Sequence, residues 1–388
     1  MKLKKYHQFL EAKSDMWDVI PQSIKDLNSI FSKAGKKLYL VGGSVRDFLT
    51  GDKPKDFDLA TDALPDEVIK ILQSYNYDFN LQGKAFGVVV AYTNDQPDGL
   101  EIATFRQDIS KGRNPEVKLG VTIEDDVKRR DLTYNSLFYD LEKREVVDLV
   151  GGKKDLEKGV TRMVGDPVER FDEDSLRILR AFRFASRYGH PLHKDTEKAI
   201  EKRKQLSNID SETGKIKRIS AERIWEEFKK AWSQAKDFNN YLNFFTKFEM
   251  WEEVFPDAFI TAIPVDSKDF IVVVSNLFKW ENPNELSKKL VDNYKIESDI
   301  ANKVEFLVRL QTFKPDLLID MYKMKVQCHI KDSTILEWLD VCKISDPLTI
   351  KFVDWKPTIS GSELLQKGFK GKELGEEMKK LEVEKFTN

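Results

Sequence analysis

Residues 38–47 have the sequence LYLVGGSVRD, in which an apolar run meets two glycines and then the start of a helical pattern. The apolar run is typical of a buried β-strand, and Gly42 and Gly43 allow other groups to approach the backbone closely. N–H groups at a helix start, with Arg46 one turn further on, suit a triphosphate. A strand–Gly–Gly–helix turn is also common without a ligand, so this stretch alone leaves both interpretations open.

Two carboxylates follow in KDFDLAT, residues 55–61. Because strand side chains repeat every two residues, Asp56 and Asp58 are expected on one face, close enough to share hard cations. Two Mg²⁺ ions held in this way can activate an attacking hydroxyl and neutralise charge on a leaving pyrophosphate. An isolated pair is often only a solvated strand end, but the Gly-Gly-helix unit upstream favours a metal site. Glu101, in the strand-like LEIATF at 100–105, either supports the metals or points to water.

The segment DDVKRRDLTYNS at 125–136 gathers charged and short polar side chains. Arg129 and Arg130 offer guanidinium groups for phosphate, and Asp131 and Asn135 offer polar groups for a ribose hydroxyl. Charge runs of this kind are usually exposed helix, so the segment decides nothing by itself.

The sequence FDEDSLRILRAFRFASR at 171–187 predicts one amphipathic helix. Beside its apolar stripe, a second stripe consists of Asp174, Arg177, Arg180 and Arg183. A carboxylate accepts a hydrogen bond from the amino group of C or A, and a guanidinium donates to the adjacent acceptor of the base. G and U present a carbonyl in place of that amino group. Asp174 with Arg177 is therefore a candidate for choosing C and A without a nucleic-acid template, and the alternative is a row of ion pairs.

Short β-rich runs alternate with helical stretches as far as residue 150, and the pattern beyond it is helical. The β-rich runs are 37–43, 86–92, 100–105 and 145–150. Later segments such as 220–235 and 284–296 carry apolar residues at spacings of three and four, whereas the polar stretch 208–218 is expected to be a loop. The expected fold is α+β and multidomain, with an N-terminal α/β head followed by an all-helical part.

Composition is typical of a globular protein. The chain has 388 residues, 40% hydrophobic and 34% charged, and its net charge of -2 excludes a strongly basic nucleic-acid coat. The two cysteines form no CxxC and the four histidines lack zinc-finger spacing, so a reducing cytosol fits and structural zinc does not. Residues 1–15 lack an apolar core, and no apolar stretch is long enough for a bilayer, so neither a signal peptide nor a membrane segment is expected.

Together these motifs resemble those of the class II CCA-adding tRNA nucleotidyltransferases of the bacterial type, within the poly(A) polymerase and tRNA nucleotidyltransferase superfamily. The resemblance covers residues 38 to about 230 and rests on GGSVRD, DFD, ATFRQD, RRDLTYNS, VGGKKDLEKG, RFDEDSLRILRAFRF and SAERI, in the family's order. Near the C-terminus, ISGSELLQKGFKGKELGEEMKKLE is similar to the closing segment of the bacterial members. The family fold is a nucleotidyltransferase α/β head followed by an all-helical neck, body and tail, which implies segments 1–152, 153–235, 236–356 and 357–388.

The resemblance also implies roles for individual residues. The family's metal-binding carboxylates fall on Asp56 and Asp58, with Mg²⁺ as the expected ion. Its nucleotide-binding positions fall on Gly43, Arg46, Arg130, Asp131, Asp174, Arg177, Arg180 and Arg183. Among these, Asp131 is similar to the residue that recognises ribose, and Asp174 with Arg177 to the amino-acid template for CTP and ATP.

The chain departs from the family pattern at a few positions. In RRDLTYNS, Leu132 stands where the family usually has Phe, Tyr134 where it has Ile or Met, and Ser136 where it has Ala. These differences change packing and leave the polar residues of the motif intact. Asn114 stands in KGRNPEV at 111–117, where His or Arg is common. The family uses this loop in its switch from C to A addition, so the departure at Asn114 bears on the efficiency of that switch.

The expected activity is stepwise addition of C, C and A to the 3′ end of tRNA from CTP and ATP in the cytoplasm. The expected partner is tRNA, held by its acceptor stem and TΨC arm, with no membrane and no obligate protein partner inferred. The alternatives are a poly(A) polymerase, an enzyme that adds only CC or only A, and a non-catalytic tRNA-binding factor. Poly(A)-adding members commonly carry basic-Phe-x-Leu-x-His where this chain has GKAFGVVVAY at 83–92, which favours CCA addition. No His-Asp dipeptide occurs, so no appended metal phosphohydrolase domain is expected.

Overall fold

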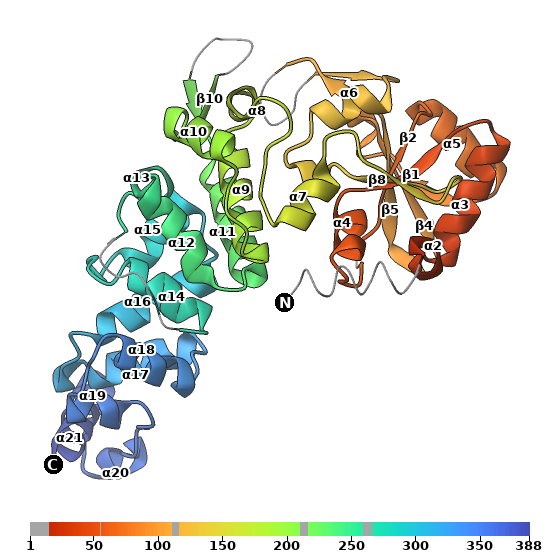
Figure 1. The fold of residues 1–388 in the computed structure, drawn as a ribbon. Helices are drawn as coiled ribbons and strands as arrows, with labels where there is room; N and C mark the ends of the chain where they lie inside the picture. Colours follow the sequence, from red (N-terminus) through yellow and green to blue (C-terminus); the bar gives the residue numbers. More distant parts are fainter. Residues whose placement is uncertain (1–14, 55, 111–115, 210–215, 259–264, 266) are drawn as a thin grey trace. The chain divides into compact units, whose positions relative to one another are not determined.

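The structure is a computed structural model that describes residues 15–54, 56–110, 116–209, 216–258, 265 and 267–388. The order of its elements along the chain is shown in Figure 1. Two compact units are present: Met1–Ile219 with Ser233–Tyr241, and Ser220–Trp232 with Leu242–Asn388. The four segments expected from the resemblance form a finer division, which stays a prediction.

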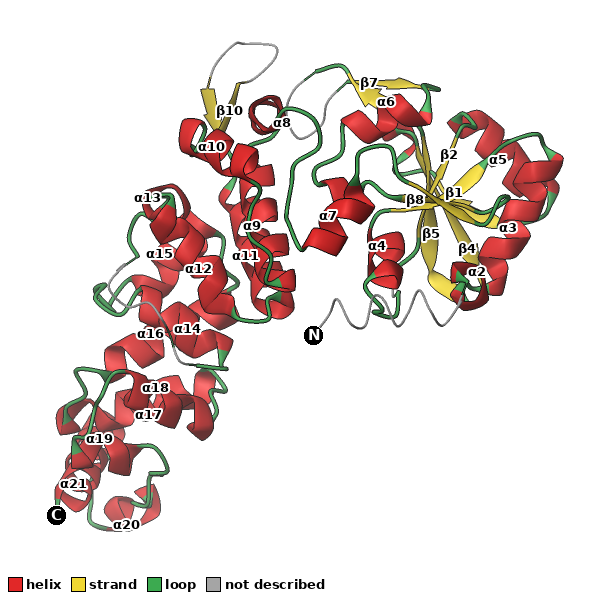
Figure 2. Ribbon diagram, in the orientation of Figure 1, coloured by secondary structure: helices red, strands yellow, loops and turns green. Residues whose placement is uncertain are grey.

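The first unit is built on a seven-stranded mixed sheet in the order β3-β4-β5-β2-β1-β8-β9. Figure 2 draws its strands in yellow, with β1, β2, β4, β5 and β8 labelled. Its strands are β1 (Leu38–Val41), β2 (Asp58–Thr61), β3 (Asp78–Asn80), β4 (Val88–Thr93), β5 (Gln96–Thr104), β8 (Phe138–Asp140) and β9 (Glu145–Val147). β2 and β5 are parallel, with Leu59 aligned to Ile102, and the other neighbours are antiparallel. The predicted α/β head is therefore confirmed, and the strand that begins at Asp58 lies in its centre.

Helices and two hairpins complete this unit. The helices are α2 (Met16–Val19), α3 (Gln22–Lys33), α4 (Gly43–Leu49), α5 (Pro65–Ser74), η1 (Lys84–Phe86), α6 (Ile123–Lys128), η2 (Thr133–Asn135), α7 (Gly152–Lys158), α8 (Pro167–Glu173), α9 (Leu176–Tyr188) and α10 (Lys194–Lys202). The hairpins pair β6 (Arg106–Asp108) with β7 (Val117–Leu119), and β10 (Ser207–Ile209) with β11 (Ile216–Arg218).

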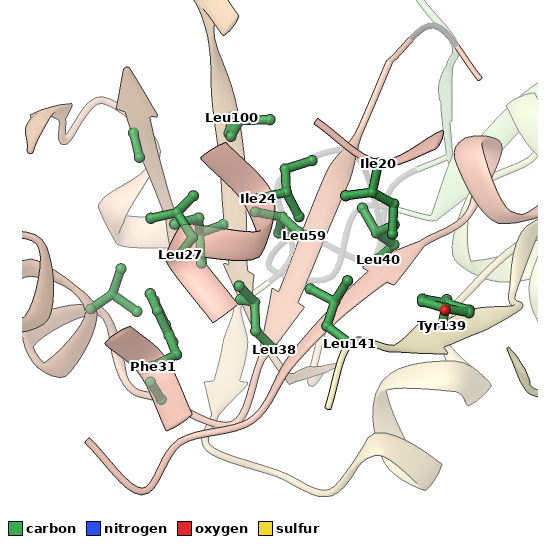
Figure 3. Packing of buried hydrophobic residues seen from close by; sticks show 14 of the residues in the cluster. Ile20, Ile24, Leu27, Phe31, Leu38, Leu40, Leu59, Leu100, Tyr139 and Leu141 are labelled. Atoms are coloured by element: carbon green, nitrogen blue, oxygen red, sulfur yellow. The ribbon is translucent and has the colours of Figure 1, made fainter. Parts of the chain in front are cut away.

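One face of the sheet holds the main core. Ile24, Leu27 and Phe31 recur at helical spacing on α3 and pack with Leu40 and Leu59 of the strands (Figure 3). Each fully buried side chain of this size contributes roughly 1.5–3 kcal/mol. This face of the sheet is therefore covered by α3 and buried in the hydrophobic core.

The opposite face holds a second cluster. Tyr39, Val41 and Ala60 alternate with the core residues along β1 and β2, and they pack with Phe105 and Phe138. The ring centroid of Tyr39 lies 5.7 Å from that of Phe105 and 6.1 Å from that of Phe138. Aromatic packing thus supports the face on which the candidate site is built.

The structure differs from the prediction at residues 208–218. This polar stretch was expected to be a loop within an all-helical part, and the structure has a pair of short strands there. β10 and β11 form an antiparallel pair with Asn208 aligned to Lys217, and residues 210–215 between them lie outside the described residues. Ile209 and Ile216 are too few to give the strand periodicity that a sequence pattern needs.

The single helix predicted over 171–187 is also corrected, because the structure divides it. α8 ends at Glu173, Asp174 is extended at φ -153° and ψ 103°, and α9 begins at Leu176. Oδ1 of Asp174 accepts the N–H of Leu176 at 3.2 Å, a local bond that competes with helix. Asp174 therefore precedes the arginine stripe of α9 and is not part of that helix.

The second unit is helical. Its elements, the first two of which contribute residues to both units, are α11 (Ala221–Gln234), α12 (Phe238–Lys247), α13 (Trp251–Val254), α14 (Phe270–Leu277), α15 (Leu286–Tyr294), α16 (Ser298–Leu310), η4 (Pro315–Leu317), α17 (Leu318–Gln327), α18 (Asp332–Val341), α19 (Pro347–Phe352), α20 (Gly361–Gln366) and α21 (Gly371–Thr387). Trp225 stacks on Phe228 and on Phe270 at centroid distances of 5.5 and 5.6 Å. Trp225 and Phe228 belong to the core, and Phe270 is partly buried against them. Among the described residues, no helix combines the length and apolar character needed to cross a membrane.

Candidate active site

A group of carboxylates lies at the start of β2. The side chain of Asp58 is exposed, and the parallel alignment of Leu59 with Ile102 makes Asp58 and Glu101 neighbours on the face opposite α3. Partial removal from water and the charges of Glu101 and Asp56 raise the pKa of Asp58, while the charge of Arg130 opposes them. The carboxylates therefore repel one another here, and a cation would relieve that repulsion.

Magnesium fits this carboxylate group. Within the part of the chain that the structure describes, no three His, Cys, Asp or Glu side chains are placed to hold a metal ion by themselves. Mg²⁺ is usually bound by one or two carboxylates together with waters and substrate phosphates, so Asp56 and Asp58 supply what the protein needs to contribute.

The Gly-Gly turn leads to a buried arginine. Gly42 precedes α4 with a φ of 73°, a conformation that suits glycine. Arg46 is only 4% exposed, and its Nε and Nη2 donate to Oδ1 of Asp47 at 2.9 and 2.8 Å. Its Nη1 donates to Oδ1 of Asn135 at 2.5 Å, and a side chain at Gly43 would lie 3.6 Å from Nη2. Arg46 is thus fixed by the protein itself, against the backbone of the turn.

A second arginine is fixed by a residue that the sequence did not reveal. Nε and Nη2 of Arg130 donate to Oδ2 of Asp126 at 3.0 and 2.8 Å, and Nε of Arg129 donates to Oδ1 at 2.9 Å. Asp126 is 1% exposed and also accepts the N–H of Arg106 at 3.1 Å. The guanidinium of Arg130 lies 4.8 Å from the ring centroid of Phe138. The available signal was the position of Asp126, three and four residues before the two arginines.

Asp131 is joined to α9. Nε of Arg180 donates to Oδ2 of Asp131 at 2.8 Å, and the N–H of Leu132 donates to Oδ1 at 2.7 Å. Burial alone would raise the pKa of Asp131, but Arg180 and Leu132 outweigh it and lower the pKa to about 2. Asp131 is therefore ionised at neutral pH and can act as an acceptor.

The other arginines of α9 have separate partners. Nη2 of Arg177 donates to the main-chain oxygen of Arg129 at 2.8 Å, and Nη1 donates to the carboxylate of Glu173. Nη1 of Arg183 donates to Oε1 of Gln234 at 2.7 Å. Arg177 thus links α9 to the residue that follows α6.

Several of the predicted site residues gather in two places in the first unit. In one of them, the charge of Arg130 acts on the carboxylate of Asp58 on the sheet. The guanidinium groups of Arg46, Arg180 and Arg183 surround the ring of Phe184, at 5.1, 5.9 and 4.3 Å from its centroid. The roles given to these residues stay predictions, and Asn114 lies outside the described residues.

Known proteins are similar to this chain in both sequence and fold. Residues 38–162 match the family described as Poly A polymerase head domain. Poly(A) polymerase I of Salmonella typhi is 34% identical over 252 residues, which are 62% of this chain and 50% of that protein. The CCA-adding enzyme of Bacillus subtilis is 39% identical over 204 residues, 52% of this chain and 47% of that protein. The chain therefore spans about half the length of the curated relatives it matches.

Solved structures match almost the whole chain. The Thermotoga maritima CCA-adding enzyme complexed with tRNA has a TM-score of 0.65 at 20% identity, covering 96% of this chain and 94% of that one. The Bacillus stearothermophilus CCA-adding enzyme in complex with CTP has a TM-score of 0.65 at 21% identity, covering 93% and 91%. Residues 38–162 thus match the Poly A polymerase head domain, and the chain as a whole has the fold of the solved CCA-adding enzymes.

Proposed function

We propose that this protein adds C, C and A in turn to the 3′ end of tRNA, from CTP and ATP, and releases pyrophosphate at each step. The observation that carries the proposal is the placement of Asp58 beside Glu101 on the sheet face opposite α3, in a region that matches the Poly A polymerase head domain, with the charge of Arg130 acting on the same carboxylate. This arrangement combines a cation-binding group with fixed positive charge, which nucleotidyl transfer requires.

Asp56 and Asp58 would hold Mg²⁺, with Glu101 as a supporting carboxylate. When bound, the ion lowers the pKa of the tRNA 3′-hydroxyl and neutralises charge on the leaving pyrophosphate. Arg46 and Arg130, which contact the triphosphate in this proposal, are oriented beforehand by Asp47 and Asp126. Such preorganisation reduces the entropy lost when the nucleotide binds.

Base choice is assigned to the segment around the start of α9. The carboxylate of Asp174 would accept from the amino group of C or A, and Arg177 would donate to the neighbouring acceptor of the base. Asp131 would accept from a ribose hydroxyl, and Gly43, Arg180 and Arg183 would complete the nucleotide site. The helical second unit would hold the acceptor stem and TΨC arm of tRNA, and the reaction would take place in the cytoplasm.

A poly(A) polymerase is the second candidate, because relatives with that name are 34% identical to this chain. The stretch 83–92 disfavours it: Phe86 is followed by Gly87 in a left-handed conformation at φ 80° and then by the valines of β4. Poly(A)-adding members commonly carry a Leu and a His in this stretch, and residues 83–92 of this chain contain neither. An enzyme that adds only CC or only A keeps the same catalytic group and differs in its products.

The proposal is tested by incubating the full chain with a tRNA transcript that lacks CCA, labelled CTP and ATP, and Mg²⁺. We expect incorporation that ceases when EDTA replaces Mg²⁺ and when Asp58 is changed to Ala, while tRNA binding persists. An active Asp58→Ala variant would overturn the metal assignment, and tRNA binding without any incorporation by the unaltered chain would identify a non-catalytic binding factor.

A further inference from the structure

The carboxylate of Asp47 joins α4 to α9. Its oxygens accept hydrogen bonds from Nε and Nη2 of Arg46 at 2.9 and 2.8 Å and from Nη2 of Arg187 at 3.2 Å. The hydroxyl of Tyr188 donates to the same carboxylate at 3.1 Å. One side chain therefore holds the buried arginine after the Gly-Gly turn and the C-terminal end of α9 together.

A second series of contacts connects Arg46 with an earlier turn of α9. Arg46 donates to Oδ1 of Asn135, and Nδ2 of Asn135 lies 3.4 Å from Oδ1 of Asp131. Asp131 in turn accepts from Arg180. Because Arg180 and Arg187 lie about two helical turns apart on α9, these contacts close a ring, which we call the Asp47 ring.

Two arginines of the Asp47 ring, Arg46 and Arg180, contact one aromatic side chain. Phe184 is 5% exposed and lies between Arg180 and Arg187 in the sequence of α9. Arg46 also lies 5.7 Å from the ring centroid of Tyr188, in addition to its contact with Phe184. Cation–π contacts of this kind stabilise the position of a guanidinium that is removed from water.

We propose that Asp47 is a positioning residue, which holds Arg46 and α9 in one fixed relation and so sets nucleotide affinity and base choice together. This inference rests on the proposed function, because Arg46, Asp131 and Arg180 are its nucleotide contacts. An uncharged residue at position 47 no longer pairs with the buried charge of Arg46 and the partly exposed charge of Arg187, so the two guanidinium groups lose their common orientation. Misplacement of a contact group by about 1 Å can reduce rates by about a hundredfold.

The test measures CTP and UTP binding to the full chain without RNA, so that no turnover occurs. Asp47→Asn is expected to weaken CTP binding by about tenfold or more and to bring the Kd values for CTP and UTP closer together. Asp140→Asn is the matched control, since Asp140 is a buried aspartate of the same unit that accepts the N–H groups of Glu142 and Lys143 in the β8–β9 turn. It should lower Tm and leave both Kd values unchanged.

Two milder variants separate positioning from general loss of structure. Tyr188→Phe removes one hydrogen bond to Asp47 and keeps the aromatic ring beside Arg46, whereas Arg187→Met removes the charged partner. The loss of preference for CTP over UTP should be smallest in Tyr188→Phe, larger in Arg187→Met and largest in Asp47→Asn. An Asp47→Asn variant with the preference of the unaltered chain would overturn this inference alone, whereas an unaltered chain that binds neither CTP nor ATP would contradict the proposed function itself.

Discussion

Nε of Arg180 lies 2.8 Å from Oδ2 of Asp131, and the two residues are 49 positions apart in the sequence. The pair joins the segment after α6 to α9, and the side chain of Asp131 is 11% exposed. A buried carboxylate with this partner and a main-chain N–H is held in its charged form.

The Asp131 pair predicts acid sensitivity. Because the pKa of Asp131 falls to about 2 on folding, its contribution is present above the unfolded pKa of about 4 and is lost as pH falls toward 2. This contribution is about 2 kcal/mol at neutral pH. Urea unfolding at pH 7 and pH 3 should show the stability gap between the unaltered chain and Asp131→Asn becoming smaller at pH 3. An equal gap at both pH values would contradict the assignment.

Asp58 should show a conflict between activity and stability. Its raised pKa means that the ionised carboxylate is unfavourable in the folded, metal-free chain, so Asp58→Asn should raise Tm slightly while it abolishes nucleotide addition. Adding Mg²⁺ with CTP should raise the Tm of the unaltered chain, since a ligand that binds the folded state stabilises it. If Asp58→Asn gains as much Tm from Mg²⁺ with CTP, the ion is held elsewhere.

Neighbouring aspartates on α6 should differ sharply. Asp126 is buried and bound to two arginines, so Asp126→Asn should destabilise the chain by roughly 3–5 kcal/mol. Asp125 forms a surface pair with Lys128, so Asp125→Asn should leave the free energy of unfolding unchanged. Equal effects in denaturant unfolding would show that Asp126 does not anchor Arg129 and Arg130.

The glycine pair after β9 predicts a steric effect. A Cβ at Gly152 would lie 2.3 Å from the main-chain oxygen of Thr133, so Gly152→Ala should cost about 1–3 kcal/mol of unfolding free energy. Gly375 on α21 is exposed with no atom close to a Cβ, and Gly375→Ala should stabilise its helix by about 0.5–1 kcal/mol. Thermal unfolding of the two variants should therefore shift in opposite directions, and a neutral Gly152→Ala would contradict the close contact.

Arg177 should control base choice. Arg177→Ala should allow more UTP and GTP to be incorporated relative to CTP and ATP, because the donor to the base is lost. Arg203→Ala is the control, since Arg203 forms a half-exposed pair with Asp172 at the end of α10. Single-nucleotide incorporation measures the effect, and unchanged selectivity in Arg177→Ala would reject the template assignment.

The sequence predicted the elements with clear periodicity. β1, β4, β5 and β9 overlap the β-rich runs, and α9, α11 and α15 overlap the segments expected to be helical. The break at Asp174 was missed because its cause is a local hydrogen bond to the N–H of Leu176, which the apolar pattern does not record.

The partners of the candidate site residues were harder to predict than the residues themselves. Asp47 precedes Arg187 by 140 positions, so their pairing depends on how α4 and α9 pack. The sequence left open whether Glu101 supports the metals or points to water, because its position beside Asp58 depends on the register of β2 with β5. Long-range register and packing therefore account for what the sequence alone did not show.

The most direct test of the proposed function is the sequence of the products. tRNA transcripts that end before CCA, after C and after CC would be incubated with the unaltered chain, Mg²⁺, CTP and ATP, and their new 3′ ends would be sequenced. The account predicts that all three transcripts end in CCA and are extended no further. Products that carry only C or only A, or a long A tail, would contradict it.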